Sequence, residues 1–107
     1  MLNQPLKIGS LVIPAPVMLA PMAGISSWPM RLLCRQHGAP LAFTEMVSAA
    51  AVARGRMQSD ALNALKTHPR DRPLGIQIFG ADPEEMARAA QSLAGLEADL
   101  IDINMGC

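Results

Sequence analysis

Apolar runs of four to six residues alternate with longer amphipathic segments along this 107-residue chain. Short runs rich in Val, Ile, Leu and Ala are typical of buried strands. The predicted strands are residues 17–20, 41–44, 74–79 and 100–103. Because successive residues in these runs are apolar, we expect a parallel sheet that is covered on both faces.

Helix signals occupy the segments between these runs. Ser27 and Pro29 predict a helix over 28–37, because serine caps helices and proline fits the first helical turn. The sequence Asp-Pro-Glu-Glu at 82–85 predicts a strong helix start, and this helix continues to about Leu93. The remaining predicted segments are a helix within 45–55, a turn or two of helix over 58–65 and a loop over 67–73.

A hairpin signal precedes the first of these strands. Two short apolar runs, 6–8 and 11–13, flank Gly9 and Ser10. Glycine at the first position of a two-residue turn suits type II′, which joins antiparallel strands.

The predicted order is a hairpin followed by four strands that alternate with helices. Alternation at this spacing indicates an α/β fold, in which parallel strands are joined by right-handed helical crossovers. A doubly wound sheet and a (β/α)₈ barrel both satisfy the pattern, and the periodicity leaves the choice open.

Composition indicates which partners and which cellular compartment to expect. Nine basic and nine acidic residues cancel, so no overall charge favours nucleic acid or an acidic membrane. Prolines interrupt the apolar N-terminus, which argues against a signal peptide and a membrane span. With only two cysteines, the chain has neither a disulfide framework nor a CxxC metal site, and we expect a reducing, cytoplasmic location.

Two groups of side chains have ordinary structural explanations. Cys34 lies in the predicted helix among Met30, Leu32 and Leu33, and we expect it in the core. A basic stretch is expected to be a solvated surface, although it is also suited to meet phosphates. Its members are Arg54, Arg56, Lys66, Arg70 and Arg72, set against Asp60 and Asp71.

Small or polar side chains lie at or near the carboxyl end of each predicted strand, where α/β enzymes place their sites. These residues are Pro21, Met22 and Ala23 after the first strand, Thr44 and Glu45 at the second, Gln77 within the third, and Asn104 and Cys107 after the fourth. Together they predict a rim suited to a flat ligand with polar edges. Taken singly, each has a structural alternative: Glu45 suits a helix cap, and Cys107 suits a small buried residue. The phosphate loops GxGxxG and GxxxxGK[ST] and the zinc motif HExxH are absent.

Four segments in this order and spacing resemble the tRNA-dihydrouridine synthases, most closely their bacterial B-type branch. The segments are APMAGISSWPMRLLC, TEMVSA, IQIFGADPEEMARAA and IDINMGC. The resemblance implies an FMN-containing (β/α)₈ barrel followed by a helical domain that grips tRNA. It also implies reduction of tRNA uridine with electrons from NADPH.

The resemblance assigns roles to individual residues. It places Pro21, Met22 and Ala23 against the flavin and makes Gln77 a hydrogen-bonding partner of the flavin ring. It makes Asn104 a ligand of the target uracil and Cys107 the proton donor. The family often has Thr-Asp where Ser26-Ser27 stand and Phe where Met30 stands, and neither departure affects the expected fold.

The resemblance also implies missing parts. A closed barrel has eight strands and typically about 250 residues, whereas residues 1–107 supply four strands of the first half. Barrel strands five to eight and the helical tRNA domain are expected to be absent, so we expect the chain alone to bind FMN weakly or not at all. The alternatives are a truncated, non-catalytic fragment and another FMN barrel of the dihydroorotate dehydrogenase type.

Overall fold

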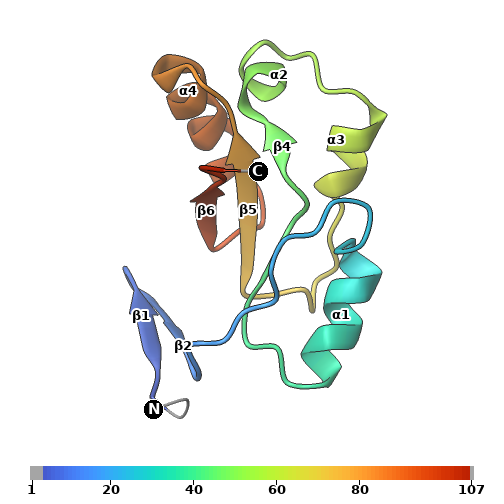
Figure 1. Cartoon of the computed structure of the whole chain (residues 1–107), viewed down its shortest axis with the longest axis vertical. Helices are drawn as coiled ribbons and strands as arrows, with labels where there is room; N and C mark the ends of the chain where they lie inside the picture. Colours follow the sequence, from blue (N-terminus) through green and yellow to red (C-terminus); the bar gives the residue numbers. More distant parts are fainter. Residues whose placement is uncertain (1–3, 107) are drawn as a thin grey trace.

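The structure, a computed structural model, describes residues 4–106. Strands and helices alternate after an N-terminal strand pair (Figure 1). The elements are β1 (Leu6–Ile8), β2 (Leu11–Ile13), α1 (Trp28–Gln36), β3 (Ala42–Phe43), β4 (Val47–Ser48), α2 (Ala49–Ala53), α3 (Ser59–Ala64), β5 (Leu74–Phe79), α4 (Pro83–Ala94) and β6 (Leu100–Ile103).

Strand β5 lies at the centre of a parallel sheet. It pairs with β3 and β4 along one side and with β6 along the other. All of these pairs are parallel, so the predicted α/β class with a parallel sheet is confirmed.

The strand predicted at 17–20 is wrong as an extended element. Among residues 4–106 this segment forms a single parallel bridge, between Leu19 and Ala42, in which the Leu19 amide donates to the Leu41 carbonyl at 3.0 Å. Prolines 16 and 21 flank this segment, and a proline has no N–H to donate to a ladder. The segment therefore follows the sheet edge without forming a regular strand.

The predicted second strand is shorter than expected and is followed by a bulge. Phe43 pairs with Gly75 and Val47 pairs with Ile78, so four steps along one strand match three along β5. At the bulge, the Thr44 hydroxyl accepts a hydrogen bond from the Gln77 amide at 3.2 Å. Residues 47–48, predicted within a helix, consequently form β4, since the extra residue allows the chain to rejoin β5 before α2 begins.

One face of the sheet packs against helices α2 and α4, and part of the opposite face packs against Ile13 of the hairpin. Side chains alternate along β5, so Ile76 and Ile78 pack in the same cluster as Ala89 and Leu93 of α4. On the opposite face, Phe43, Leu41 and Ile13 form a second buried cluster, with Leu100 packed against it.

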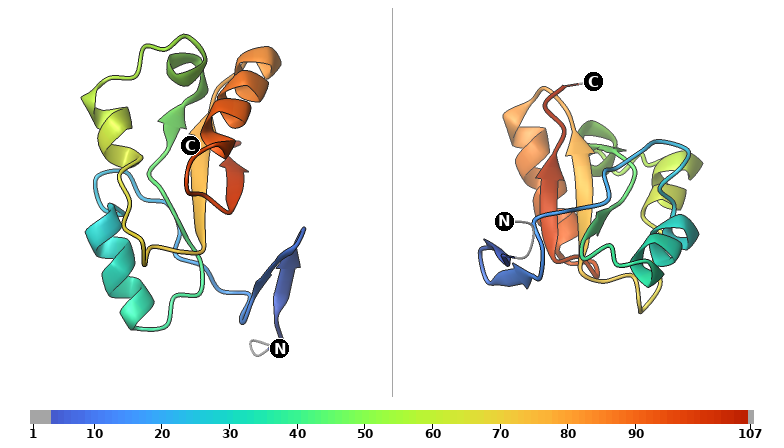
Figure 2. Two further views of the ribbon diagram at one scale, coloured as in Figure 1. Left: turned by 180° about the vertical axis from the view of Figure 1, so that it is seen from behind. Right: turned by 60° about the horizontal axis from the view of Figure 1, so that its bottom comes forward.

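Strands β1 and β2 pair antiparallel, with Leu6 opposite Ile13. Gly9 adopts a φ of +59° at the turn between them. Ile13 is fully buried and contributes the hairpin's contact with the second cluster. The hairpin therefore packs against the helix-free face, the face opposite α4, toward the end of the sheet at which β5 begins (Figure 2).

Gly75 has no room for a side chain. A Cβ at this position would overlap the Phe43 ring and lie 2.8 Å from Leu100 Cδ1, on the two strands that flank β5. We expect Gly75→Ala to lower the free energy of unfolding by about 1–3 kcal/mol, the usual cost of overpacking a core. Urea denaturation checks this, with Gly95→Ala as the control because its nearest neighbouring atom would be 3.6 Å away. Equal stabilities of the two variants would contradict the prediction.

Helix starts follow the sequence signals to different degrees. Asp82 caps α4 as predicted, since its carboxylate accepts hydrogen bonds from the amides of Glu84 and Glu85, both at 2.9 Å. Ser27 occupies the cap position of α1, but its side chain makes no capping hydrogen bond. Cys34 was expected in the core, but it is only half-buried. The residue of α1 that is fully buried is Arg31.

Asp71 is fully buried, which corrects its assignment to a solvated loop. Its carboxylate accepts from Arg31 Nε and Arg35 Nε, both at 2.9 Å, and from the Thr67 hydroxyl at 3.0 Å. Arg31 also donates to the Ser26 carbonyl at 2.7 Å. A buried carboxylate needs such partners because burial of an unpaired charge is expensive. The predicted loop 67–73 is thus anchored to α1 through its one acidic side chain.

Asp99 joins the starts of β5 and β6. Its carboxylate accepts from Arg72 Nη2 at 2.7 Å and from the Leu74 amide at 2.8 Å. The hydrogen bond from the Arg72 side chain is the main cause that lowers the pKa of Asp99, opposed by partial burial. A lowered pKa in the folded state adds stability that is present above the ordinary pKa and lost as the pH falls through the folded value.

We therefore expect Asp99→Asn to reduce stability at neutral pH, with the difference from the parent shrinking below about pH 4. Urea unfolding at a series of pH values from neutral to acid measures this. Asp60→Asn, which removes an exposed acid that forms no ion pair between described residues, serves as the control. A difference that stays constant across the acid range would refute the assignment.

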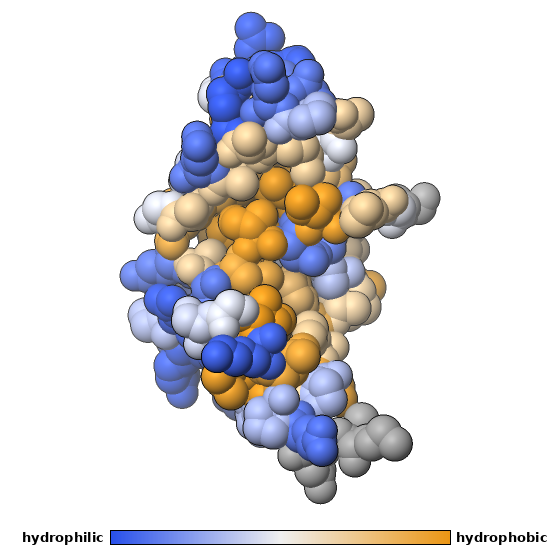
Figure 3. Space-filling model, turned by 90° about the vertical axis from the view of Figure 1, so that its left-hand side faces the viewer, coloured by the Kyte–Doolittle hydropathy of each residue, from blue (hydrophilic) through white to orange (hydrophobic). Residues whose placement is uncertain are grey.

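The edge of β6 that faces away from β5 has no strand partner among residues 4–106. The face on this side of the molecule is broadly apolar across its middle (Figure 3). Ile103 on β6 is 54% exposed and Met105 beyond it is 93% exposed. Exposed apolar side chains next to an unpaired strand edge form a surface that readily pairs with further chain. Within the described part of the chain, no helix is both long and apolar enough to cross a membrane.

Candidate active site

Gln77 is the central polar side chain at the carboxyl end of the sheet. It is 8% exposed and lies on the helix-free face, because it alternates with Ile76 and Ile78. Its Nε2 donates to Asp102 Oδ2 at 2.6 Å, and its Oε1 accepts from Asn104 Nδ2 at 3.4 Å. Gln77, Asp102 and Asn104 therefore form one chain of hydrogen bonds, called here the amide chain.

Sequence reasoning missed Asp102. The register pairs Asp102 directly with Gln77 across β5 and β6, and side chains of paired residues project to the same face. The two-residue spacing from Asp102 to Asn104 was the available signal, since it places both on one side of an extended segment.

Asn104 is held on three sides. Its backbone N–H donates to the Ile78 carbonyl at 2.9 Å, which fixes the end of β6 against β5. Its side-chain oxygen accepts from the Gly106 amide at 3.0 Å, and Nδ2 lies 3.8 Å from the sulfur of Met46. The predicted substrate residue Asn104 and the predicted cofactor residue Gln77 are thus neighbours. Cys107 follows Gly106 and lies outside the described residues.

The loop after residues 17–20 is shaped by Ser26. The Met22 amide donates to Ser26 Oγ at 2.8 Å, and the Ser26 hydroxyl donates back to the Met22 carbonyl at 3.0 Å. Pro21 and Met22 are half-buried and Ala23 is exposed. Because Arg31 holds the Ser26 carbonyl, the buried ion pair with Asp71 extends to the backbone of this loop.

Glu45 connects this loop to the sheet. Its Oε2 accepts from the Gly24 amide at 2.7 Å. The suggested helix-capping role belongs instead to Ser48, whose Oγ accepts from the Ala51 amide at 3.3 Å. The tips after the first and second predicted strands are therefore tied together at the same end of the sheet as Gln77.

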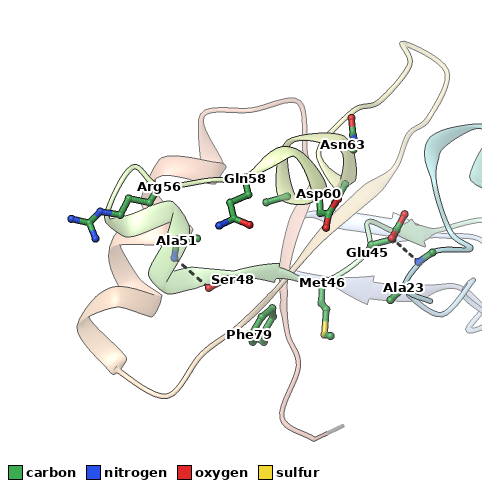
Figure 4. A pocket seen from close by; sticks show the side chains of 13 residues that line it. Ala23, Glu45, Met46, Ser48, Ala51, Arg56, Gln58, Asp60, Asn63 and Phe79 are labelled. Atoms are coloured by element: carbon green, nitrogen blue, oxygen red, sulfur yellow. Dashed lines mark hydrogen bonds between the residues drawn. The ribbon is translucent and has the colours of Figure 1, made fainter.

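A pocket of about 630 Å³ opens beside this rim, between the loop, β4 and α3 (Figure 4). Of the residues predicted at the rim, Ala23 and Glu45 line it. Met46 lines the pocket and also contacts Asn104, so the pocket and the amide chain are adjacent. Among residues 4–106, no group of three or more His, Cys, Asp or Glu side chains is placed to hold a metal ion.

Comparison with known proteins identifies the family. The sequence model described as Dihydrouridine synthase (Dus) matches residues 18–107. The chain belongs to the dihydrouridine synthase family. It is 41% identical over 102 residues to "tRNA-dihydrouridine synthase B" of Pasteurella multocida, covering 95% of this chain and 30% of that protein. It is 39% identical over 106 residues to "Probable tRNA-dihydrouridine synthase 1" of Synechocystis sp., covering 97% of this chain and 29% of that protein.

The chain is much shorter than its curated relatives. This dihydrouridine synthase chain spans about 30% of the length of the curated relatives that it matches. A third relative, "Probable tRNA-dihydrouridine synthase" of Aquifex aeolicus, is 41% identical over 92 residues, which cover 85% of this chain and 28% of that protein. The family recognised from the sequence motifs is therefore confirmed.

Proposed function

We propose that residues 1–107 form the first half of an FMN-binding (β/α)₈ barrel in a tRNA-dihydrouridine synthase of the B type. The enzyme reduces uridine in tRNA to 5,6-dihydrouridine, with NADPH as the reductant. Family membership supports the reaction class. The observation that carries the site is the amide chain, in which Gln77, Asp102 and Asn104 present hydrogen-bonding groups at one rim.

The open edge of β6 supports the barrel assignment. The fifth barrel strand would pair with this edge and satisfy its unpaired backbone groups, and the added half-barrel would cover the exposed Ile103 beside it. A C-terminal helical domain that binds tRNA completes the proposed enzyme, which acts in the cytoplasm and needs neither a membrane nor a metal ion.

The residues at the rim fit a flavin. A glutamine amide has two N–H groups and an oxygen with two lone pairs. Gln77 gives one N–H to Asp102 and one lone pair to Asn104, so one donor and one acceptor remain for the polar edge of a ring. Met22 and Ala23, with Pro21 before them, would hold the ring from the neighbouring loop, where Ala23 adds little bulk. Bound FMN, once reduced by NADPH, would supply the hydride that adds to C6 of the uracil.

The chain's own residues then handle orientation and the proton. Asn104 holds the edge of the uracil, which must leave its stack to reach the rim, as base-modifying enzymes require. Cys107 donates a proton to C5 as negative charge develops there. A free thiol has a pKa of about 8.5, so at neutral pH it is mostly protonated and able to act as an acid.

The proposal is tested by expressing the full-length gene in a strain that lacks dihydrouridine in tRNA. Mapping modified positions should show that one or a few uridines are reduced again. A matched Gln77→Leu variant should lose bound flavin absorbance in the purified protein. Complete absence of dihydrouridine from tRNA, with soluble full-length protein present, would refute the function.

A further inference from the structure

The lining of the pocket between α3 and β4 includes polar side chains that the proposed reaction does not use. We propose that it binds the ribose of a second nucleotide of the RNA, next to the uridine at the rim. This inference rests on the proposed function, because it takes RNA as the substrate. It assigns a ligand class to a pocket that lies outside the amide chain.

The size and position of the pocket suit a single nucleotide unit. Its volume of about 630 Å³ is within the range of roughly 300–1,000 Å³ usual for small-molecule sites. Gly24 and Glu45 form the wall nearest the loop, and the 2.7 Å hydrogen bond between them fixes this wall. Alanines 51, 61 and 64 line the pocket as well, and their small side chains keep it open.

The polar groups in the pocket match hydroxyl groups. Figure 4 shows the side chains of Gln58 and Asp60 pointing toward β4, while those of Arg56 and Asn63 point away. Ser48 Oγ already accepts a hydrogen bond from Ala51, so its hydroxyl hydrogen is available to donate. A ribose hydroxyl both donates and accepts. It can therefore donate to the Asp60 carboxylate and accept from the Gln58 amide or the Ser48 hydroxyl.

Charge decides between the sugar and the phosphate of a nucleotide. Glu45 and Asp60 place two carboxylates on the pocket wall, and like charges would repel a phosphate there. Arg56 and Asp60 take part in no ion pair between described residues, so Arg56 is available at the outer edge for the phosphate. The sugar thus lies inside and the phosphate outside.

Adjacency to the rim points to an RNA strand. Met46 lines the pocket and contacts Asn104, so a ligand in the pocket and a base at the amide chain would be neighbours. Consecutive nucleotides of one strand meet this requirement. Recognition of the 2′-hydroxyl is also how proteins distinguish RNA from DNA.

The test is nuclear magnetic resonance titration of the ¹⁵N-labelled chain with uridine 5′-monophosphate, 2′-deoxyuridine 5′-monophosphate and NADP⁺. We expect the ribonucleotide to shift the amides of residues 45–48 and 58–64, and the deoxynucleotide to bind roughly tenfold more weakly, as for loss of a hydrogen bond to a charged group. Asp60→Asn should weaken ribonucleotide binding about tenfold, whereas Glu97→Gln, which removes one charge at the turn between α4 and β6, should leave it unchanged.

Three results would overturn the inference: no shifts at the pocket, equal binding of the two nucleotides, or shifts with NADP⁺ alone. If the isolated chain aggregates, filter binding of tRNA to the full-length protein compares the same two variants. A tenfold loss for Asp60→Asn alone is again expected, and equal affinities would overturn the inference. Neither readout depends on flavin or on uridine reduction, so a failed pocket and a failed enzyme assignment are distinguishable.

Discussion

Removing the carboxylate of Asp71 is expected to lower the free energy of unfolding by about 3–5 kcal/mol, the usual effect of breaking a buried ion pair. Arg31 and Asp71 have fully buried side chains, with Arg31 Nη2 at 2.8 Å from Asp71 Oδ2. Asp71→Ala leaves the Arg31 charge buried without its counterion, and it also removes an acceptor from Arg35 and Thr67.

Urea denaturation followed by circular dichroism measures this loss. Because a small domain has only about 5–15 kcal/mol of stability, we expect the variant to be partly unfolded at 37 °C. Asp60→Ala is the matched control, since Asp60 is exposed and in no ion pair between described residues, and its effect should stay within about 0.5 kcal/mol. A loss below 1 kcal/mol for Asp71→Ala would show that the buried pair contributes little.

The second large effect concerns catalysis. In the proposed full-length enzyme, Cys107→Ala should slow uridine reduction roughly a hundredfold to ten-thousandfold, the typical contribution of a positioned proton donor. Flavin binding should be unchanged, because the substitution removes only the acid that protonates C5. Rapid mixing of reduced enzyme with tRNA, followed by flavin absorbance, gives the rate directly.

The other cysteine provides the control for this experiment. Cys34 is half-buried on α1 and is not among the residues of the proposed rim, so Cys34→Ala should reduce tRNA at the parent rate. An unchanged rate for Cys107→Ala would remove this thiol from the mechanism. Equal slowing of both variants would point instead to a general effect of thiol loss on the fold.

Capping residues and short apolar runs in the sequence correctly predicted one helix start and two strands. Asp82 followed by proline caps α4, and the apolar runs 74–79 and 100–103 form the strands β5 and β6. The prediction of a regular strand at 17–20 was wrong, because the prolines that flank this segment have no N–H to donate and because pairing depends on neighbours distant in the sequence. Likewise, the bulge at Thr44 arises from pairing with β5, and no pattern of apolar and polar residues along the sequence signals it.

The candidate site was predictable only in part. Gln77 and Asn104 were singled out from their places near strand ends, and they lie within hydrogen-bonding distance of each other at 3.4 Å. Their roles toward flavin and uracil stay predictions, as does that of Cys107. Asp102 was missed because its role depends on the strand register, which places its carboxylate opposite Gln77 and which the sequence does not reveal.

The sequence by itself determined the α/β class, most helix starts and the family, because these depend on periodicity, capping residues and motifs that can be read along the chain. The tertiary structure decided which polar groups are buried and which ones meet. Asp71 resembled a solvated loop residue, yet it is fully buried between two arginines. Burial and pairing depend on residues 36 and 40 positions apart in the chain, and only the folded arrangement brings those residues within hydrogen-bonding distance.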